Sequence, residues 1–222
     1  YDRSGISQNP ETLARAGATA HQRVYDGKES HAQAIRELYG ENHPWQHVST
    51  MQTATLDDVF REHGRNVNAA HRNVGLVIET RPDSINCESL TLLRAIGCTK
   101  IQMGVQSLNE QVLEANKRHT SPEQIAQAFA LCRLFGFKSH AHFMANLLGA
   151  TPGGDASDFR TLVSDKRFLP DEVKMYPCAL IDGTGLMAHY ADGTWRPYNE
   201  RELVGVLADN VLATPPYTRI SR

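Results

Sequence analysis

Hydrophobic and polar residues follow two different periods between positions 74 and 106. Residues 74–78 form a short, nearly continuous apolar run, which is typical of a strand in a covered parallel sheet. Residues 88–96 place their apolar side chains at helical spacing, and Gly97 ends that pattern. Residues 101–105 are apolar at alternate positions, as a second strand requires. The pattern predicts a strand, a helix and a parallel strand, the βαβ unit.

The rest of the chain continues this alternation. We expect helices at 55–68, 110–115, 122–135, 155–165 and 199–212, strands at 138–144 and 172–178, the start of a strand at 217–222, and weaker helical patterns at 11–25 and 31–39. In the helix at 55–68, Thr55 is the expected cap and Leu56, Val59 and Phe60 are expected to face inward.

Strands that alternate with helices indicate an α/β fold with a parallel sheet. Four strands are too few for an eight-stranded barrel, and no G-x-G-x-x-G follows a strand, which argues against a doubly wound sheet. We therefore expect a partial parallel (βα) barrel over residues 55–222. Residues 1–54 are polar and are interpreted as a helical insertion or lid.

Polar residues gather at the expected carboxyl ends of the strands, where parallel βα folds bind ligands. These residues are Glu79 and Arg81, Gln106 and Ser107, His140 and His142, and Lys174 and Tyr176. Together they suit a polar ligand with hydroxyl, amino-acid or purine groups. Five of these residues have a simpler interpretation: a surface ion pair for Glu79 with Arg81, a strand cap for Gln106, and a structural role for the two histidines. Lys174, in a buried strand, should have a charged partner or a ligand.

Composition narrows the function classes. The 222 residues are 41% hydrophobic with a net charge of -2 and a pI near 6.6, so no basic stripe marks a nucleic-acid surface. No apolar run is long enough for a membrane span. Four cysteines without C-x-x-C spacing predict free thiols in a cytoplasmic protein, and the spacing of the histidines predicts no metal site. The chain begins at Tyr1 and its end reads as the start of a strand, so we expect a fragment.

Several long runs, in order, resemble the Elongator catalytic subunit family in its bacterial and archaeal form. They are IETRPD at 78–83, GCTKIQMGVQSLNEQVL at 97–113, GFKSHAHFMANLLGATP at 136–152, PDEVKMYPCALIDGT at 170–184 and RPYNEREL at 196–203. The similarity extends from about residue 68 to residue 222 and leaves residues 1–54 outside. It implies a radical S-adenosylmethionine enzyme with a partial barrel, which acts on wobble uridine 34 of tRNA.

The resemblance also implies ligands and residue roles. Members carry a 4Fe-4S cluster and an acetyltransferase domain, and a 5′-deoxyadenosyl radical takes hydrogen from acetyl-CoA before carboxymethylation of the uridine. Glu79, Gln106 and His142 would contact S-adenosylmethionine, and Lys117, in the run NKRHT at 116–120, takes the place of the family's arginine beside the same cofactor. Lys174 and Tyr176 would line the barrel near the substrate as catalytic residues.

The chain also departs from the family. The three closely spaced cysteines that hold the cluster and the acetyltransferase domain are missing from this sequence. We therefore expect this chain alone to be inactive, as an incomplete core. The alternatives are a non-catalytic homologue that serves as a scaffold for tRNA or a protein partner, another radical enzyme such as a porphyrinogen oxidase or methylthiotransferase relative, and a phosphate-binding barrel enzyme.

Overall fold

A computed structural model describes residues 10–30, 33–34 and 54–222. Contacts divide the chain into one unit of residues 1–55 and 180–188 and a second unit of residues 56–179 and 189–222. In the first unit, α1 (Pro10–Tyr25) confirms the helix expected at 11–25, and Arg23 pairs with Glu29 at 2.7 Å. The helix expected at 31–39 lies outside the described residues except for positions 33–34, which are helical.

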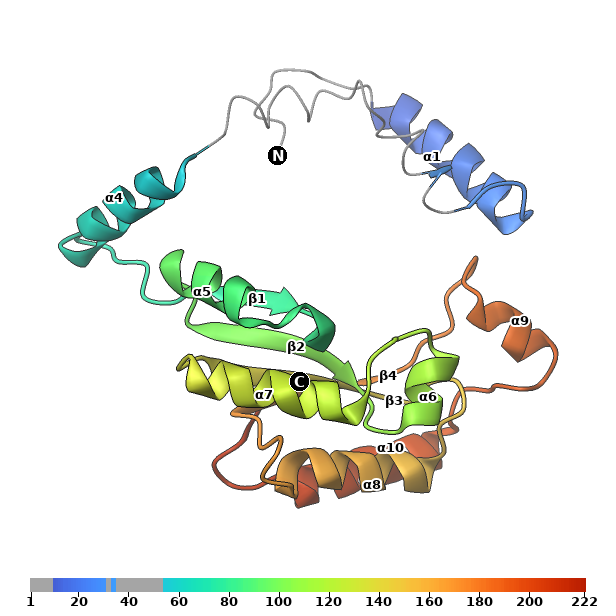
Figure 1. Ribbon diagram of the computed structural model, residues 1–222. Coiled ribbons are helices and arrows are strands. Elements are labelled where there is room, and N and C mark those ends of the chain that lie inside the picture. The colour runs from blue at the N-terminus through green and yellow to red at the C-terminus, as the bar shows by residue number, and fades with distance from the viewer. Residues whose placement is uncertain (1–9, 31–32, 35–53) are drawn as a thin grey trace. The chain divides into compact units, whose positions relative to one another are not determined.

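The second unit contains five parallel strands in sequential order (Figure 1). They are β1 (Val77–Thr80), β2 (Lys100–Gln106), β3 (Lys138–Ala145), β4 (Glu172–Pro177) and β5 (Arg219–Ile220). The four predicted strands are present, and the start of a strand near the end of the chain is confirmed as β5. Sequential order in a parallel sheet requires a crossover between each pair of neighbours, as in a partial (βα) barrel.

Helices and loops supply the crossovers. The helical elements between residues 56 and 222 are α4 (Leu56–Val67), η1 (Pro82–Ser84), α5 (Cys87–Ala95), α6 (Glu110–Ala115), α7 (Pro122–Leu134), α8 (Pro152–Ser164), α9 (Leu186–Ala191) and α10 (Glu200–Ala213). Side chains of Asn86, Ser121 and Asn199 accept hydrogen bonds from backbone N–H groups in the first turns of α5, α7 and α10. The expected helix at 155–165 begins earlier, at Pro152, because Thr151 caps it.

The two faces of the sheet differ in chemistry because alternate residues of a strand point to opposite faces. Ile101, Met103, Ala141, Phe143 and Val173 on one face are fully buried and pack in one core with residues of α5, α7 and α8. Figure 1 shows α7 and α8 along that face. The opposite face carries the polar residues of the same strands, so the helices lie outside and the polar groups lie inside the curved sheet.

Two local predictions are wrong. The strand predicted to include residues 74–78 begins only at Val77, and Val74, which precedes it, is 81% exposed. Leu56 and Phe60 of α4 are about half exposed, Val59 is only partly buried, and α4 has no buried residue. The periodicity correctly predicted an amphipathic helix, but within the described residues no element covers its apolar face.

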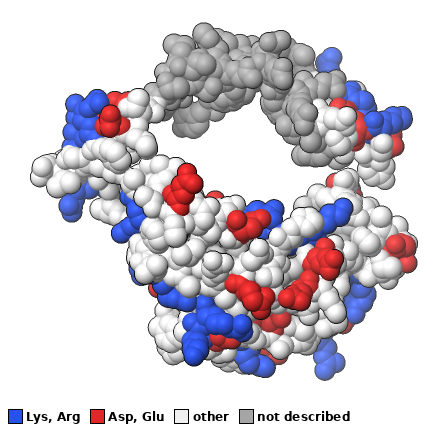
Figure 2. Space-filling view, in the orientation of Figure 1, with Lys and Arg blue, Asp and Glu red and all other residues white. Residues whose placement is uncertain are grey.

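Charges of both signs are interspersed on the visible face of the molecule, with no continuous basic stripe (Figure 2). No helix among the described residues is both long enough and apolar enough to cross a membrane.

Candidate functional site

The parallel register aligns the polar strand residues in rows on the inner face. Glu79, Gln102, His140 and Glu172 occupy one row across β1 to β4. One step closer to the carboxyl ends, His142 lies beside Lys174, and the next pair is Met144 and Tyr176. Alternation along a strand predicts that His140 and His142 point to one side of the sheet, and the contact between their rings, with centroids 5.1 Å apart, confirms it.

Glu172 and His140 of this row belong to a polar network that also includes Lys100 of β2 and Ser221. Lys100 Nζ lies 2.9 and 3.0 Å from the two carboxylate oxygens of Glu172, across β3. His140 Nδ1 lies 3.6 Å from Glu172 Oε2, and His140 Nε2 is 3.0 Å from Ser221 Oγ just after β5. Burial, followed by the positive field of His142, lowers the pKa of His140 to about 4. Burial opposes ionisation of Glu172, but the hydrogen bonds and charge of Lys100 hold its pKa below the usual value.

His142 lies between this network and the carboxyl ends. Its side chain is buried, and Nδ1 lies 3.4 Å from Glu79 Oε1. The ring meets those of His140 and Tyr176 edge-to-face, at centroid distances of 5.1 and 5.8 Å. Burial lowers the pKa of His142, so the ring is neutral at pH 7. Its Nε2 atom is buried and has no hydrogen-bond partner among the described residues, so it is available to a ligand.

Lys174 and Tyr176 lie together at the end of β4. Lys174 Nζ is 5.0 Å from the centre of the Tyr176 ring, in a cation–π contact. The sequence predicts a charged partner or a ligand for Lys174, and within the described residues Lys174 makes no ion pair. The surface ion pair considered for Glu79 with Arg81 is also wrong: Arg81 pairs with Asp83 at 2.8 Å.

The end of β2 is a strained turn with unpaired polar atoms. Gln106 has a φ of 70°, in the left-handed region that residues other than glycine rarely adopt. Its Oε1 atom is buried without a hydrogen-bond partner among the described residues. Strain and unpaired polar groups at one position are typical of a binding site.

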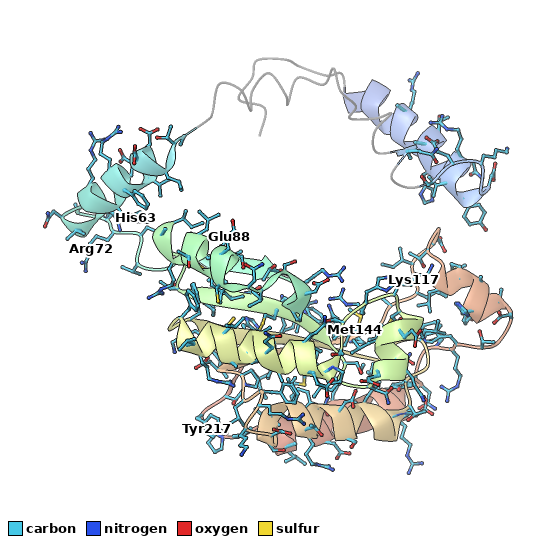
Figure 3. The ribbon with its side chains drawn as sticks, in the orientation of Figure 1. His63, Arg72, Glu88, Lys117, Met144 and Tyr217 are labelled. Carbon is cyan, nitrogen blue, oxygen red and sulfur yellow. The ribbon has the colours of Figure 1, made fainter. Side chains whose placement is uncertain are left out.

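Arg118 is a site residue that sequence reasoning missed. Its Nη2 atom donates to the carbonyl of Gly104 at 2.7 Å, and its buried Nε atom has no partner in the described part of the chain. A Cβ atom at Gly104 would lie 3.2 Å from both Arg118 Nη2 and Gln106 Nε2, so glycine leaves room for both side chains. Lys117 is exposed on the loop after α6 (Figure 3). The only signal for Arg118 in the sequence is its place in the run NKRHT at 116–120, one position after that of the family's arginine.

Two carboxylates of α8 hold the neighbouring loops. Asp158 Oδ2 accepts hydrogen bonds from Ser107 Oγ at 2.5 Å and from the backbone N–H groups of Leu108 and Asn109 at 3.0 Å. Asp155 Oδ2 accepts from the Asn146 N–H and the Tyr198 hydroxyl, each at 2.8 Å. The loops that follow β2 and β3 are therefore fixed to the same helix, and Ser107 acts as a structural residue.

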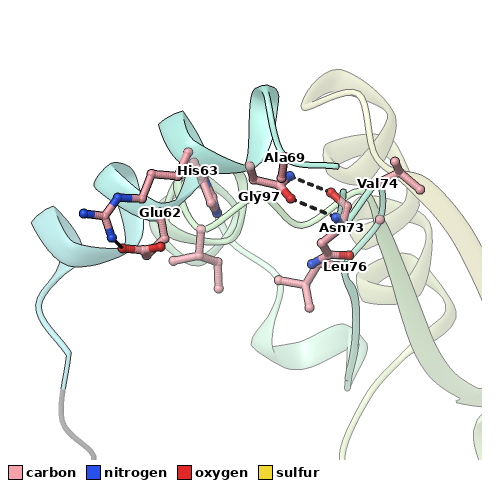
Figure 4. Close-up of a pocket in the computed structure, with 11 residues that line it drawn as sticks. Glu62, His63, Ala69, Asn73, Val74, Leu76 and Gly97 are labelled. Carbon is pink, nitrogen blue, oxygen red and sulfur yellow. Dashed lines mark hydrogen bonds and ion pairs between the residues drawn. The ribbon is translucent and has the colours of Figure 1, made fainter. Parts of the chain in front are cut away.

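A cavity of about 500 Å³ lies at the other end of the sheet, before β1 and β2 (Figure 4). Its lining includes His63 and Asn66 of α4, Leu76 and Gly97, and the Asn66 side chain is hydrogen-bonded to the backbone of Asn73. None of the unpaired buried side-chain atoms lies in its lining. The polar face is therefore the better candidate for a ligand site.

Comparison with known proteins agrees with this geometry. Residues 19–157 match the model of the radical SAM superfamily, and residues 170–222 match the radical SAM C-terminal domain. The chain belongs to the radical SAM superfamily. The predicted resemblance to the Elongator catalytic subunit family and the partial barrel are both confirmed by the relatives and structures that follow.

A tRNA uridine(34) acetyltransferase of Dehalococcoides mccartyi is 37% identical over 157 residues, which are 71% of this chain and 34% of that protein. The solved structure of Elp3 from Methanocaldococcus infernus, with residues 1–46 deleted, is 34% identical with a TM-score of 0.68. It is matched over 71% of this chain and 37% of that chain. This chain thus spans about a third of the length of both.

The coproporphyrinogen III oxidase HemN of Escherichia coli matches 94% of this chain and 47% of its own, with a TM-score of 0.52 and 17% identity. That likeness shows the fold alone and does not support the porphyrinogen oxidase alternative.

The four cysteines are free: Cys87 and Cys132 lie in α5 and α7, whereas Cys98 and Cys178 lie just before β2 and just after β4. Among residues 10–30, 33–34 and 54–222, no group of three or more His, Cys, Asp or Glu side chains is arranged to hold a metal. The described residues therefore do not fit a 4Fe-4S cluster. The polar face does fit S-adenosylmethionine, because its buried unpaired atoms include both donors and acceptors for an amino acid and a ribose.

Proposed function

We propose that this chain is part of the radical core of a tRNA-modifying enzyme and that its polar face binds S-adenosylmethionine. The observation that carries the proposal is a set of three buried side-chain atoms without hydrogen-bond partners among the described residues: Gln106 Oε1 on β2, His142 Nε2 on β3 and Arg118 Nε on the loop after α6. Leaving such atoms unpaired costs about 1–3 kcal/mol each, which a polar ligand would offset.

Each group has a role that its chemistry supports. Arg118 suits the carboxylate of the amino-acid moiety, since a guanidinium binds carboxylates through parallel hydrogen bonds. Gln106 and Glu79 suit the amino group and the ribose hydroxyls, and neutral His142 can donate to or accept from a hydroxyl through Nε2. Lys117 remains a proposed contact at the exposed rim of the site.

When bound, S-adenosylmethionine supplies the radical chemistry of the superfamily. The residues of this chain bind it and orient it, and burial holds both histidines neutral. By similarity to the tRNA uridine(34) acetyltransferase, we propose acetyl-CoA and tRNA as substrates and carboxymethylation of wobble uridine 34 as the reaction. Lys174 and Tyr176 would face the substrate. A tRNA substrate and four free thiols also favour a cytoplasmic location.

Calorimetric titration of the purified protein with S-adenosylmethionine tests this function. Gln106→Ala and Arg118→Gln should each weaken binding about 10- to 100-fold, the effect of losing one hydrogen bond to a charged group. Gln127→Ala and Arg201→Gln remove similar groups from exposed positions of α7 and α10 and should have no effect. If the folded protein does not bind S-adenosylmethionine, the cofactor assignment is wrong and the scaffold alternative is favoured.

A further inference from the structure

Two cations lie against one aromatic ring on the inner face. Lys174 Nζ is 5.0 Å and Arg222 Cζ is 5.4 Å from the centre of the Tyr176 ring. Lys174 belongs to β4, and Arg222 follows β5, whose register places it beside β4. The backbone N–H of Met175 donates to the Arg222 carbonyl at 2.9 Å, which holds Arg222 next to this strand.

Neither cation is neutralised within the described residues. The nearby carboxylates are engaged elsewhere: Glu172 with Lys100 and His140, and Glu79 with His142. The positive field of Lys174 also contributes to the lowered pKa of His140 and His142, although burial is the larger cause for both. Two like charges beside one ring repel each other, and a bound anion would remove that repulsion.

The geometry points to a phosphate-binding subsite, formed by Lys174 and Arg222, for a nucleotide whose base or ribose lies near Tyr176. A guanidinium binds phosphate through paired hydrogen bonds, and an ammonium adds a compact positive charge. The ring offers a face on which a base can stack. This subsite goes beyond the proposed cofactor site, because S-adenosylmethionine carries no phosphate.

The phosphate can come from two sources. One is the backbone of a single-stranded RNA loop, and the other is a coenzyme such as coenzyme A, which carries a diphosphate and a ribose phosphate. Inorganic pyrophosphate, coenzyme A and a tRNA anticodon stem-loop are therefore the three probes. Binding of each is measured by calorimetry to the full purified protein and to the double variant Lys174→Gln/Arg222→Gln.

Lys166→Gln/Arg201→Gln is the matched control, since both residues are exposed and the change in charge is the same. Weaker binding of pyrophosphate and coenzyme A by tenfold or more, with the control unchanged, supports the subsite and identifies a coenzyme phosphate. Weaker binding of the stem-loop alone supports the subsite and identifies RNA. In that case, the slope of log K against log salt should also fall by about 1.4 for the two lost phosphate contacts.

The inference is overturned if the double variant and the control bind all three probes equally, or if the wild-type protein binds none. Circular dichroism verifies that each variant is folded. S-adenosylmethionine binding by Arg222→Gln separates the two proposals: a variant that loses pyrophosphate but keeps S-adenosylmethionine has lost the subsite alone. Failure of S-adenosylmethionine to bind the wild-type protein would refute the cofactor site and leave the phosphate result standing.

Discussion

His140 should make the stability of this fold depend on pH. Its ring is 3% exposed, and its pKa falls from 6.5 to about 4 in the folded protein, mainly because of burial. Between these two values the unfolded chain binds more protons than the folded chain, so acid favours unfolding. The contribution of His140 to stability is therefore complete above about pH 6.5 and is lost as the pH falls toward 4.

The two pKa values set the magnitude. Between pH 7 and pH 5, linkage gives a loss of about 2 kcal/mol in the free energy of unfolding from this one group. Urea unfolding at the two pH values, followed by circular dichroism, measures the difference. His140→Gln cannot titrate but can still hydrogen-bond to Ser221, and should remove about that amount of the pH dependence. The part due to His142, whose pKa is also lowered, should remain.

The control is His63→Gln, which makes the same substitution at an exposed position of α4. The reasoning would be refuted if the free energy of unfolding of His140→Gln fell between pH 7 and pH 5 by as much as that of the wild-type protein. That result would mean that the buried ring is not the group whose protonation unfolds the sheet.

Two further predictions concern packing and charge. Lys100→Met should lower the free energy of unfolding by about 2–3 kcal/mol, because it leaves the Glu172 carboxylate largely buried without its partner. The double variant Lys100→Met/Glu172→Met should lower it by less. Urea titrations measure both losses, and additive effects of the two substitutions would contradict this reasoning. Phe129→Ala should lower the free energy of unfolding by about 3–5 kcal/mol, since Phe129 is fully buried against Phe168. The control is Leu134→Ala: Leu134 is 78% exposed on the same helix, so this change should shift the unfolding midpoint little. Equal effects of the two substitutions would rule out this account of the core.

Local patterns predicted most of the fold. The helix expected at 110–115 coincides with α6, and the helix expected at 122–135 matches α7 except at its last residue. Alternation in the strands also predicted that His140 and His142 share a face. These features depend on backbone geometry and on neighbours within a few residues, and such signals are present in the sequence itself.

Partners far apart in the chain were decided by tertiary structure alone. Glu79 faces His142 rather than Arg81 because strand register, set by packing of the whole sheet, brings β1 and β3 side chains together. Arg118, not Lys117, turns toward Gly104 because the loop after α6 adopts positive φ at Lys117. The sequence by itself determined the alternating elements and the polar inner face; the tertiary structure decided which of those polar groups meet, because contact depends on register and loop conformation.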